Sequence, residues 1–145
     1  MKTEEQDMKI EEKKVLVVGT GISGIAAAKL LLEKKIDTVL FDANKELDIE
    51  KFHEKAPELK DVPMILGELT EEQMHEFGVA VLSPGVPTDL PMVERLRAQN
   101  VAIWGEIELA YYFGKGRLIA ITGTNGKTTT TALTGEIMKN YFDDV

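Results

Sequence analysis

The residues best suited to chemistry lie in a glycine-rich segment, GTNGKTT, at positions 123–129. Gly123 and Gly126 allow the backbone to curl so that successive N–H groups can point at phosphate oxygens. Lys127 can reach the terminal phosphates of a nucleotide as a point charge, and the Thr128 hydroxyl can bind Mg²⁺. The G-x-x-G-K-T spacing is shorter than the usual G-x-x-x-x-G-K-[ST] loop, but it still predicts phosphate binding.

Another glycine-rich turn occurs near the start of the chain, where Gly19, Gly21 and Gly24 give the pattern G-x-G-x-x-G. This turn lies between an apolar run and a helix-like segment, so backbone N–H groups at the helix start can face an anion. Asp42 ends the next apolar run, where an acceptor for a ribose or a base is expected. The pattern favours a phosphorylated ligand without distinguishing NAD, FAD or another nucleotide; alternatively, the glycines only tighten the turn.

A third loop, LSPGVP at positions 82–87, follows a predicted strand. It therefore lies at the carboxyl edge of the predicted sheet, where open α/β sheets bind ligands. Ser83 offers a hydroxyl group, and Gly85 allows close backbone approach to a ligand. A turn shaped only by its prolines and glycine fits the residues equally well.

Apolar runs that alternate with helix-like segments must position these loops. The predicted strands lie at 13–19, 37–43, 63–68, 79–82, 101–105 and 115–123. The predicted helices lie at 24–35, 46–61 with a break at Pro57, 69–78 with Thr70 as N-cap, 90–100, 106–114 and 127–142. This alternation predicts an α/β fold with a doubly wound, mostly parallel sheet.

Composition narrows the possible classes of protein. The 145 residues include 43% hydrophobic residues, no cysteine and a net charge of −8. The chain can therefore build a core, and it has neither disulfides nor thiolate metal sites. Its acidity argues against a nucleic-acid polymer as partner. The absence of a signal segment and of a membrane-length apolar run predicts a cytoplasmic protein that does not bind membranes, and we expect a monomer.

The segment FGKGR at 113–117 is the best candidate for a domain boundary, because two glycines lie between charged residues. Only one strand and one helix follow it, and a lone pair of this kind cannot bury both faces of its strand. The strand either joins the first sheet or opens a second domain whose remainder lies elsewhere, and we favour the second alternative. The acidic start, 1–12, is expected to be disordered.

The segment ITGTNGKTTTT resembles the ATP-binding loop of the Mur ligases and of their folylpolyglutamate synthetase relatives. The segments GTGISG, LSPGVP and GEIELA resemble the branch of the Mur ligases that adds D-glutamate to UDP-N-acetylmuramoyl-L-alanine. This resemblance implies a Rossmann-like domain for the UDP-substrate at 13–115. It also implies that 116–145 is the first βα unit of an incomplete P-loop ATPase domain.

The resemblance also implies residue roles and a reaction. The UDP-substrate site would comprise Gly21, Ile22, Ser23, Asp42, Ala43, Ser83 and Gly85. The ATP site would comprise Gly123, Thr124, Asn125, Gly126, Lys127, Thr128 and Thr129, with Lys127 catalytic and Thr128 a ligand of Mg²⁺. ATP would phosphorylate the substrate carboxylate, and the amine of D-glutamate would attack the acyl phosphate.

Other parts of such an enzyme, including further metal ligands and the amino-acid-binding domain, would lie past Val145. We therefore expect the 145 residues alone to lack ligase activity. Two alternatives remain open: a Rossmann-type NAD-binding regulatory module, and a ligase similar to folylpolyglutamate synthetase.

Overall fold

The computed structural model describes residues 9–115 and 117–143 of the chain. The chain divides into two compact units, Met1–Phe113 and Gly114–Val145. The first unit holds the glycine turn near the start of the chain, and the second holds the GTNGKTT segment.

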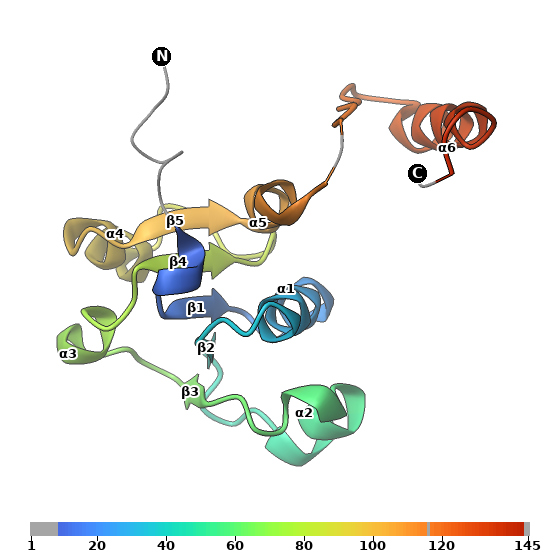
Figure 1. The fold of residues 1–145 in the computed structure, drawn as a ribbon. Coiled ribbons are helices and arrows are strands. Elements are labelled where there is room, and N and C mark those ends of the chain that lie inside the picture. Colours follow the sequence, from blue (N-terminus) through green and yellow to red (C-terminus); the bar gives the residue numbers. More distant parts are fainter. Residues whose placement is uncertain (1–8, 116, 144–145) are drawn as a thin grey trace. The chain divides into compact units, whose positions relative to one another are not determined.

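The first unit is built on a five-stranded sheet with strand order β3-β2-β1-β4-β5. All four neighbouring pairs of strands are parallel. Figure 1 shows β1, β4 and β5 pointing the same way. The strands are β1 (Val15–Val18), β2 (Thr38–Asp42), β3 (Met64–Leu66), β4 (Val79–Leu82) and β5 (Ala102–Gly105). The first five predicted strands are thus confirmed, and so is their parallel arrangement.

Helices cover both faces of this sheet (Figure 1). The helices of the unit are α1 (Ile22–Glu33), α2 (Ile49–Lys55), α3 (Glu71–Met74), α4 (Pro91–Ala98) and α5 (Glu106–Phe113), with short 3₁₀ helices η2 (Ile10–Glu12) and η3 (Pro57–Leu59). One core cluster joins α1, α2 and α5 to the sheet, and the other joins α3 and α4 to it. The sheet is therefore doubly wound, as predicted.

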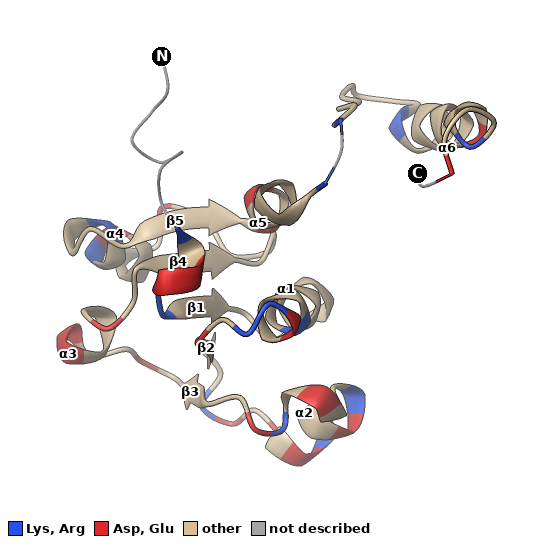
Figure 2. Cartoon of the chain, viewed as in Figure 1, with Lys and Arg blue, Asp and Glu red and all other residues tan. Residues whose placement is uncertain are grey.

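Alternation along β1 shows why its sequence is apolar throughout. Val15 and Val17 belong to one core cluster, whereas Leu16 and Val18 belong to the other. A strand covered on both faces needs apolar side chains at every position. Figure 2 accordingly shows charged residues on helices and loops, while β1, β4 and β5 carry none.

Local signals correctly predicted two helix boundaries. Thr70 caps α3: its hydroxyl accepts a hydrogen bond from the Gln73 N–H at 3.2 Å, and the Gln73 side chain accepts one from the Thr70 N–H at 3.0 Å. This reciprocal pair satisfies two N–H groups that a helix start leaves free. Helix α2 ends at Lys55, and Pro57 begins η3, which confirms the predicted break.

The start of the chain differs from the expected disordered tail. Residues 1–8 of that tail lie outside the described residues. Ile10–Glu12 form η2, and the Ile10 side chain is fully buried in the core. The Tyr112 hydroxyl holds this turn by donating to the Glu11 carboxylate at 2.7 Å and accepting from the Ile10 N–H at 3.4 Å. Burial of one isoleucine outweighs the charged composition around it.

The second unit contains helix α6 (Lys127–Met138), as predicted. The predicted strand at 115–123 is wrong: among its described residues, 115 and 117–123, none is in a strand. Leu118 and Ile119 are exposed, and α6 has no buried residue. A strand needs hydrogen-bonding neighbours and a covered face, and the described residues of this unit supply neither.

Candidate functional site

The first glycine turn is tightly built at two of its three glycines. Gly19 has φ +101°, a backbone conformation that residues other than glycine rarely adopt. A Cβ atom on Gly24 would lie only 1.9 Å from the carbonyl oxygen of Gly19. Gly24 therefore allows α1 to approach the end of β1, which is the role that the glycine pattern predicts.

Gly21 faces open space instead. It is the N-cap of the 12-residue helix α1, and no side chain caps it. A Cβ atom on Gly21 would meet nothing within 4 Å. Ile22 beside it is 91% exposed. The N–H groups and positive end of α1 are thus accessible to an anion.

Ser83 lies against this turn from the loop that follows β4. Its N–H donates to the Val18 carbonyl at 3.0 Å, which ties the loop to the end of β1. Its hydroxyl oxygen would lie 2.9 Å from a Cβ on Gly19 and 3.1 Å from one on Gly24. This oxygen is buried and has no hydrogen-bond partner among the described residues. A buried hydroxyl without a partner is costly, so Ser83 has a hydrogen-bonding group beside the turn that the described residues do not use.

Asp42, at the end of β2, is held by three hydrogen bonds. Its Oδ2 accepts from the Thr20 N–H at 3.1 Å and from the Thr20 hydroxyl at 2.5 Å. Its Oδ1 accepts from the Asn44 N–H at 2.9 Å. Partial burial on its own raises the pKa of Asp42, but the bonds from the Thr20 hydroxyl and from the two N–H groups outweigh it and hold the pKa below its usual value. Asp42 is therefore an ionised acceptor beside the turn.

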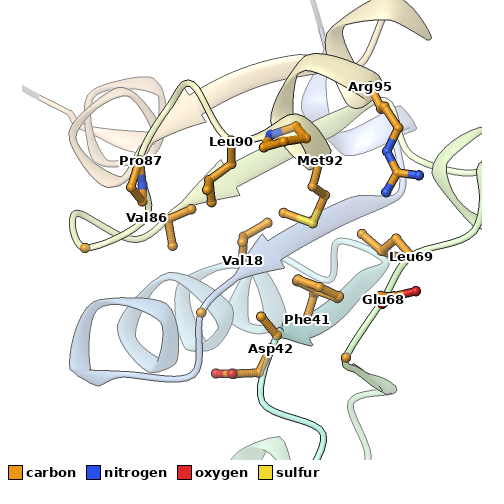
Figure 3. A pocket seen from close by; sticks show the side chains of 15 residues that line it. Val18, Phe41, Asp42, Glu68, Leu69, Val86, Pro87, Leu90, Met92 and Arg95 are labelled. Carbon is orange, nitrogen blue, oxygen red and sulfur yellow. The ribbon is translucent and has the colours of Figure 1, made fainter.

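A pocket of about 400 Å³ opens at the carboxyl ends of β1 and β2. Figure 3 shows Asp42 near one end of it and Arg95 near the other. The apolar residues that line it include Val18, Phe41, Val86, Pro87, Leu90 and Met92. The pocket thus combines apolar walls with a few polar groups, as small-molecule sites generally do.

The predicted site residues are divided between the pocket and the turn. Asp42, Ala43 and Gly85 line the pocket. The remaining predicted residues, Gly21, Ile22, Ser23 and Ser83, belong to the turn or to the loop against it and are not among the lining residues. Sequence reasoning missed the apolar walls, because their residues are scattered over several loops. It also missed Thr20, although a hydroxyl inside the glycine pattern was a usable signal.

Arg95, at one end of the pocket, already forms an ion pair. Arg95 lies 3.4 Å from the Glu71 carboxylate, and both side chains are about half exposed. Gln99 also donates a hydrogen bond to Glu71. An exposed pair of this kind contributes little to stability.

The second glycine turn has the backbone shape of a helix-capping loop. Gly123 has φ +150° and Gly126 has φ +78°, and Gly126 is the N-cap of α6. The Lys127 ammonium donates a hydrogen bond to the Gly123 carbonyl at 2.6 Å, so it lies across the loop. The other predicted residues here, Thr124, Asn125, Thr128 and Thr129, are exposed.

Two further findings concern only residues 9–115 and 117–143. No group of three or more His, Cys, Asp or Glu side chains could hold a metal ion there. No helix in that part of the chain combines the length and apolar character needed to cross a membrane.

The fold and site define an α/β domain with a tight glycine-rich turn and a pocket at the carboxyl edge of a parallel sheet. A family model described as the Mur ligase MurD-like N-terminal domain matches residues 13–105. The chain belongs to this family.

Curated relatives agree with this assignment. A UDP-N-acetylmuramoylalanine–D-glutamate ligase of Lachnoclostridium phytofermentans is 53% identical over 133 residues, which cover 92% of this chain and 29% of the relative. A protein of the same name from Lachnospira eligens is 48% identical, with 92% of this chain and 30% of the relative covered. The chain therefore spans about 30% of the length of these relatives.

Solved structures show the same fold at lower identity. A UDP-N-acetylmuramate–alanine ligase from Thermotoga maritima is 24% identical, with a TM-score of 0.54 over 88% of this chain and 29% of that one. A pseudomurein peptide ligase type C from Methanothermus fervidus is 23% identical, with a TM-score of 0.55 over 88% of this chain and 26% of that one.

Proposed function

We propose that this chain is part of an ATP-dependent ligase of peptidoglycan precursor synthesis, which adds D-glutamate to UDP-N-acetylmuramoyl-L-alanine. The names of the relatives and the family support the proposal. We further propose that residues 13–115 bind the UDP end of that substrate and that 116–145 begin an ATP-binding domain. The enzyme would be a cytoplasmic monomer.

One observation in the structure carries the UDP-binding proposal. The Ser83 hydroxyl is buried without a partner next to Gly19 and Gly24, at the accessible N-terminus of α1. A diphosphate oxygen would accept a hydrogen bond from that hydroxyl, and the N–H groups after Gly21 would bind the same anion. Ala43 and Gly85 would then border the uridine portion in the pocket. Ile22 and Ser23 would contact the ligand through their N–H groups at the helix start.

The second turn would supply the ATP site. The N–H groups of Gly123 to Thr129 would surround the phosphates, and Lys127 would exchange its bond to the Gly123 carbonyl for a phosphate oxygen. The Thr128 hydroxyl would bind Mg²⁺, which neutralises charge on the transferred phosphoryl group. These residues fit such a ligand in type and backbone shape, because Gly123 and Gly126 both have positive φ.

In the proposed reaction, the γ-phosphoryl group of ATP passes to an oxygen of the substrate carboxylate, and ADP leaves. The amine of D-glutamate then attacks the acyl carbon, loses a proton and expels phosphate, which forms the amide. Phosphoryl transfer needs several positioned groups at once. We therefore propose that the 145-residue chain alone forms no amide, and that a longer protein containing it does.

Calorimetric titration of the chain with UDP-N-acetylglucosamine tests the binding proposal. The wild-type chain is expected to bind this ligand, and Ser83→Ala is expected to weaken binding about 5-fold or more because one charge-assisted hydrogen bond is lost. Thr88→Ala is the matched control, since Thr88 is an exposed residue of the same β4–α4 loop and does not line the pocket. Equal losses in the two variants would contradict the role of Ser83.

A turnover assay tests the ligase proposal separately. The chain and a longer protein that contains it would each receive UDP-N-acetylmuramoyl-L-alanine, D-glutamate, ATP and Mg²⁺. Amide product is expected only from the longer protein, and Lys127→Ala is expected to reduce it by about 10²-fold or more. Product from the 145 residues, or an active Lys127→Ala enzyme, would overturn this part of the proposal.

A further inference from the structure

Thr20 is the non-glycine residue between Gly19 and Gly21, and its side chain is partly buried. It binds Asp42 twice, through its N–H at 3.1 Å and its hydroxyl at 2.5 Å, and both bonds end on the same oxygen, Oδ2. The two residues are 22 positions apart in the chain. Thr20 therefore connects the glycine turn after β1 to the end of β2.

These hydrogen bonds leave one acceptor position of the Asp42 carboxylate free. A carboxylate has about four lone-pair positions, of which Thr20 uses two on Oδ2. The Asn44 N–H uses one on Oδ1, at 2.9 Å. The remaining acceptor position is thus on Oδ1, and Asp42 lines the pocket.

This arrangement differs from the general use of an acidic residue at the end of the second strand. In dinucleotide-binding folds that residue accepts hydrogen bonds from a ribose hydroxyl above the glycine turn. Here the oxygen that faces the turn is already occupied by Thr20. A ribose diol that needs both carboxylate oxygens would have to displace the Thr20 hydroxyl.

We propose that Thr20 is a positioning and specificity residue, which holds the Asp42 carboxylate so that only Oδ1 accepts from a nucleotide in the pocket. The inference rests on the proposed uridine-nucleotide site and identifies what orients its acceptor. The contact between Thr20 and Asp42 selects ligands that present a single hydrogen-bond donor to Asp42, such as one N–H or one hydroxyl. It disfavours dinucleotides that bind through a ribose diol.

The test uses the 145-residue chain and four variants: Thr20→Val, Thr20→Ser, Asp42→Ala and the double variant T20V/D42A. Valine keeps the shape and the N–H of Thr20 but removes the hydroxyl, whereas serine keeps the hydroxyl. The other charged residues that line the pocket, Glu68 and Arg95, stay unchanged. Affinity for UDP-N-acetylglucosamine is measured by calorimetry. The Asp42 carboxyl group is titrated by ¹³C NMR in the unliganded protein.

Thr20→Val is expected to weaken binding of UDP-N-acetylglucosamine about 3- to 10-fold and to raise the pKa of Asp42 toward its usual value. Thr20→Ser is expected to match the wild type within about 2-fold. In the Asp42→Ala background, Thr20→Val should cause no further loss, because Thr20 acts through Asp42. NADH binding should rise in Thr20→Val relative to the wild type.

Several results would overturn this inference. One is an equal loss of UDP-N-acetylglucosamine affinity in the valine and serine variants, and another is an unchanged pKa of Asp42 in Thr20→Val. A third is a full loss of affinity on Thr20→Val when Asp42 is already alanine. The fourth is unchanged NADH binding in Thr20→Val. A wild-type chain that does not bind UDP-N-acetylglucosamine would contradict the proposed function instead. The Asp42 titration and the NADH measurement would still decide whether Thr20 controls the carboxylate.

Discussion

The two glycine-rich turns have similar residues and very different surroundings. In the first unit, a Cβ on Gly19 or on Gly24 would meet the Ser83 side chain, and the strand before them is buried on both faces. In the second unit, a Cβ on Gly126 would meet nothing within 4 Å, and α6 has no buried residue. The first turn is therefore shaped by tertiary packing, whereas the second is shaped by its own backbone and by the Lys127 bond to Gly123.

This difference separates two properties of a glycine-rich turn: its local backbone conformation and its packing against other elements. Positive φ at Gly19, Gly123 and Gly126 is local and is present in both turns. Packing of a helix against a strand requires the rest of a sheet, and among the described residues the first unit alone has one. A glycine-rich turn can thus have its local backbone shape without the packing that would hold it rigid.

The largest effect is expected from alanine at the packed glycine. Gly24→Ala would place a Cβ 1.9 Å from the Gly19 oxygen, so the free energy of unfolding should fall by about 3 kcal/mol or more. Gly126→Ala should cost about 1–2 kcal/mol locally, because of its positive φ, and should leave the first unit unchanged. The single tryptophan, Trp104, belongs to the core of the first unit, so its fluorescence in urea measures that unit.

Gly21→Ala is the matched control within the same turn, since a Cβ there meets nothing within 4 Å. It should change the free energy of unfolding by less than about 0.5 kcal/mol. Similar losses in Gly24→Ala and Gly21→Ala would contradict the packing account of the first turn.

A second comparison concerns two apolar side chains, one from each unit. Ile10 is fully buried, whereas Leu133 on α6 is 60% exposed. Ile10→Ala should lower the free energy of unfolding by about 2–4 kcal/mol, and Leu133→Ala should leave it within about 0.5 kcal/mol. Urea unfolding followed by Trp104 fluorescence measures both. A stable Ile10→Ala variant would restore the view that this segment is a free tail.

Acid should distinguish the Thr20–Asp42 contact from ordinary packing. The pKa of Asp42 is held below its usual value, so its ionised form stabilises the folded state at neutral pH. That contribution is lost as the pH falls through the folded-state pKa. Thr20→Val should therefore destabilise the chain more at pH 7 than at pH 3, in urea unfolding. An equal loss at both pH values would mean that the contact is purely steric.

The smallest effect is expected from removal of the second unit. Every residue of the two core clusters lies at or before position 113. A chain that ends at Phe113 should therefore unfold with a free energy within about 0.5 kcal/mol of the longer chain. A clear loss of stability, seen by Trp104 fluorescence, would show that the second unit supports the first.

The sequence predicted the first sheet well, because its signals are local and repeated. Apolar runs such as VLVV mark buried parallel strands, and Thr70 and Pro57 mark helix boundaries. The strand predicted at 115–123 has an equally apolar pattern, but neighbouring strands decide whether such a run pairs. Ile10 was missed for the converse reason, since one isoleucine among charged residues gives no local sign of burial.

The candidate site was predictable at its turns and less so at its pocket. The spacing of Gly19, Gly21 and Gly24 and the position of Asp42 follow from a strand–turn–helix–strand pattern. The bond from Thr20 to Asp42 depends on the close approach of two loops, which sequence alone does not fix. The apolar walls of the pocket come from separate loops for the same reason.

The most direct measurement is an amide NMR map of the 145-residue chain during titration with UDP-N-acetylglucosamine and, separately, with NADH. We predict that the uridine nucleotide shifts the amide signals of Gly21, Ser23, Ala43, Ser83 and Gly85. Signals of α6 should not move, and NADH should cause little change. Shifts at these residues with NADH alone, or no shifts with the uridine nucleotide, would contradict the assignment of the first glycine turn to the UDP end of the substrate.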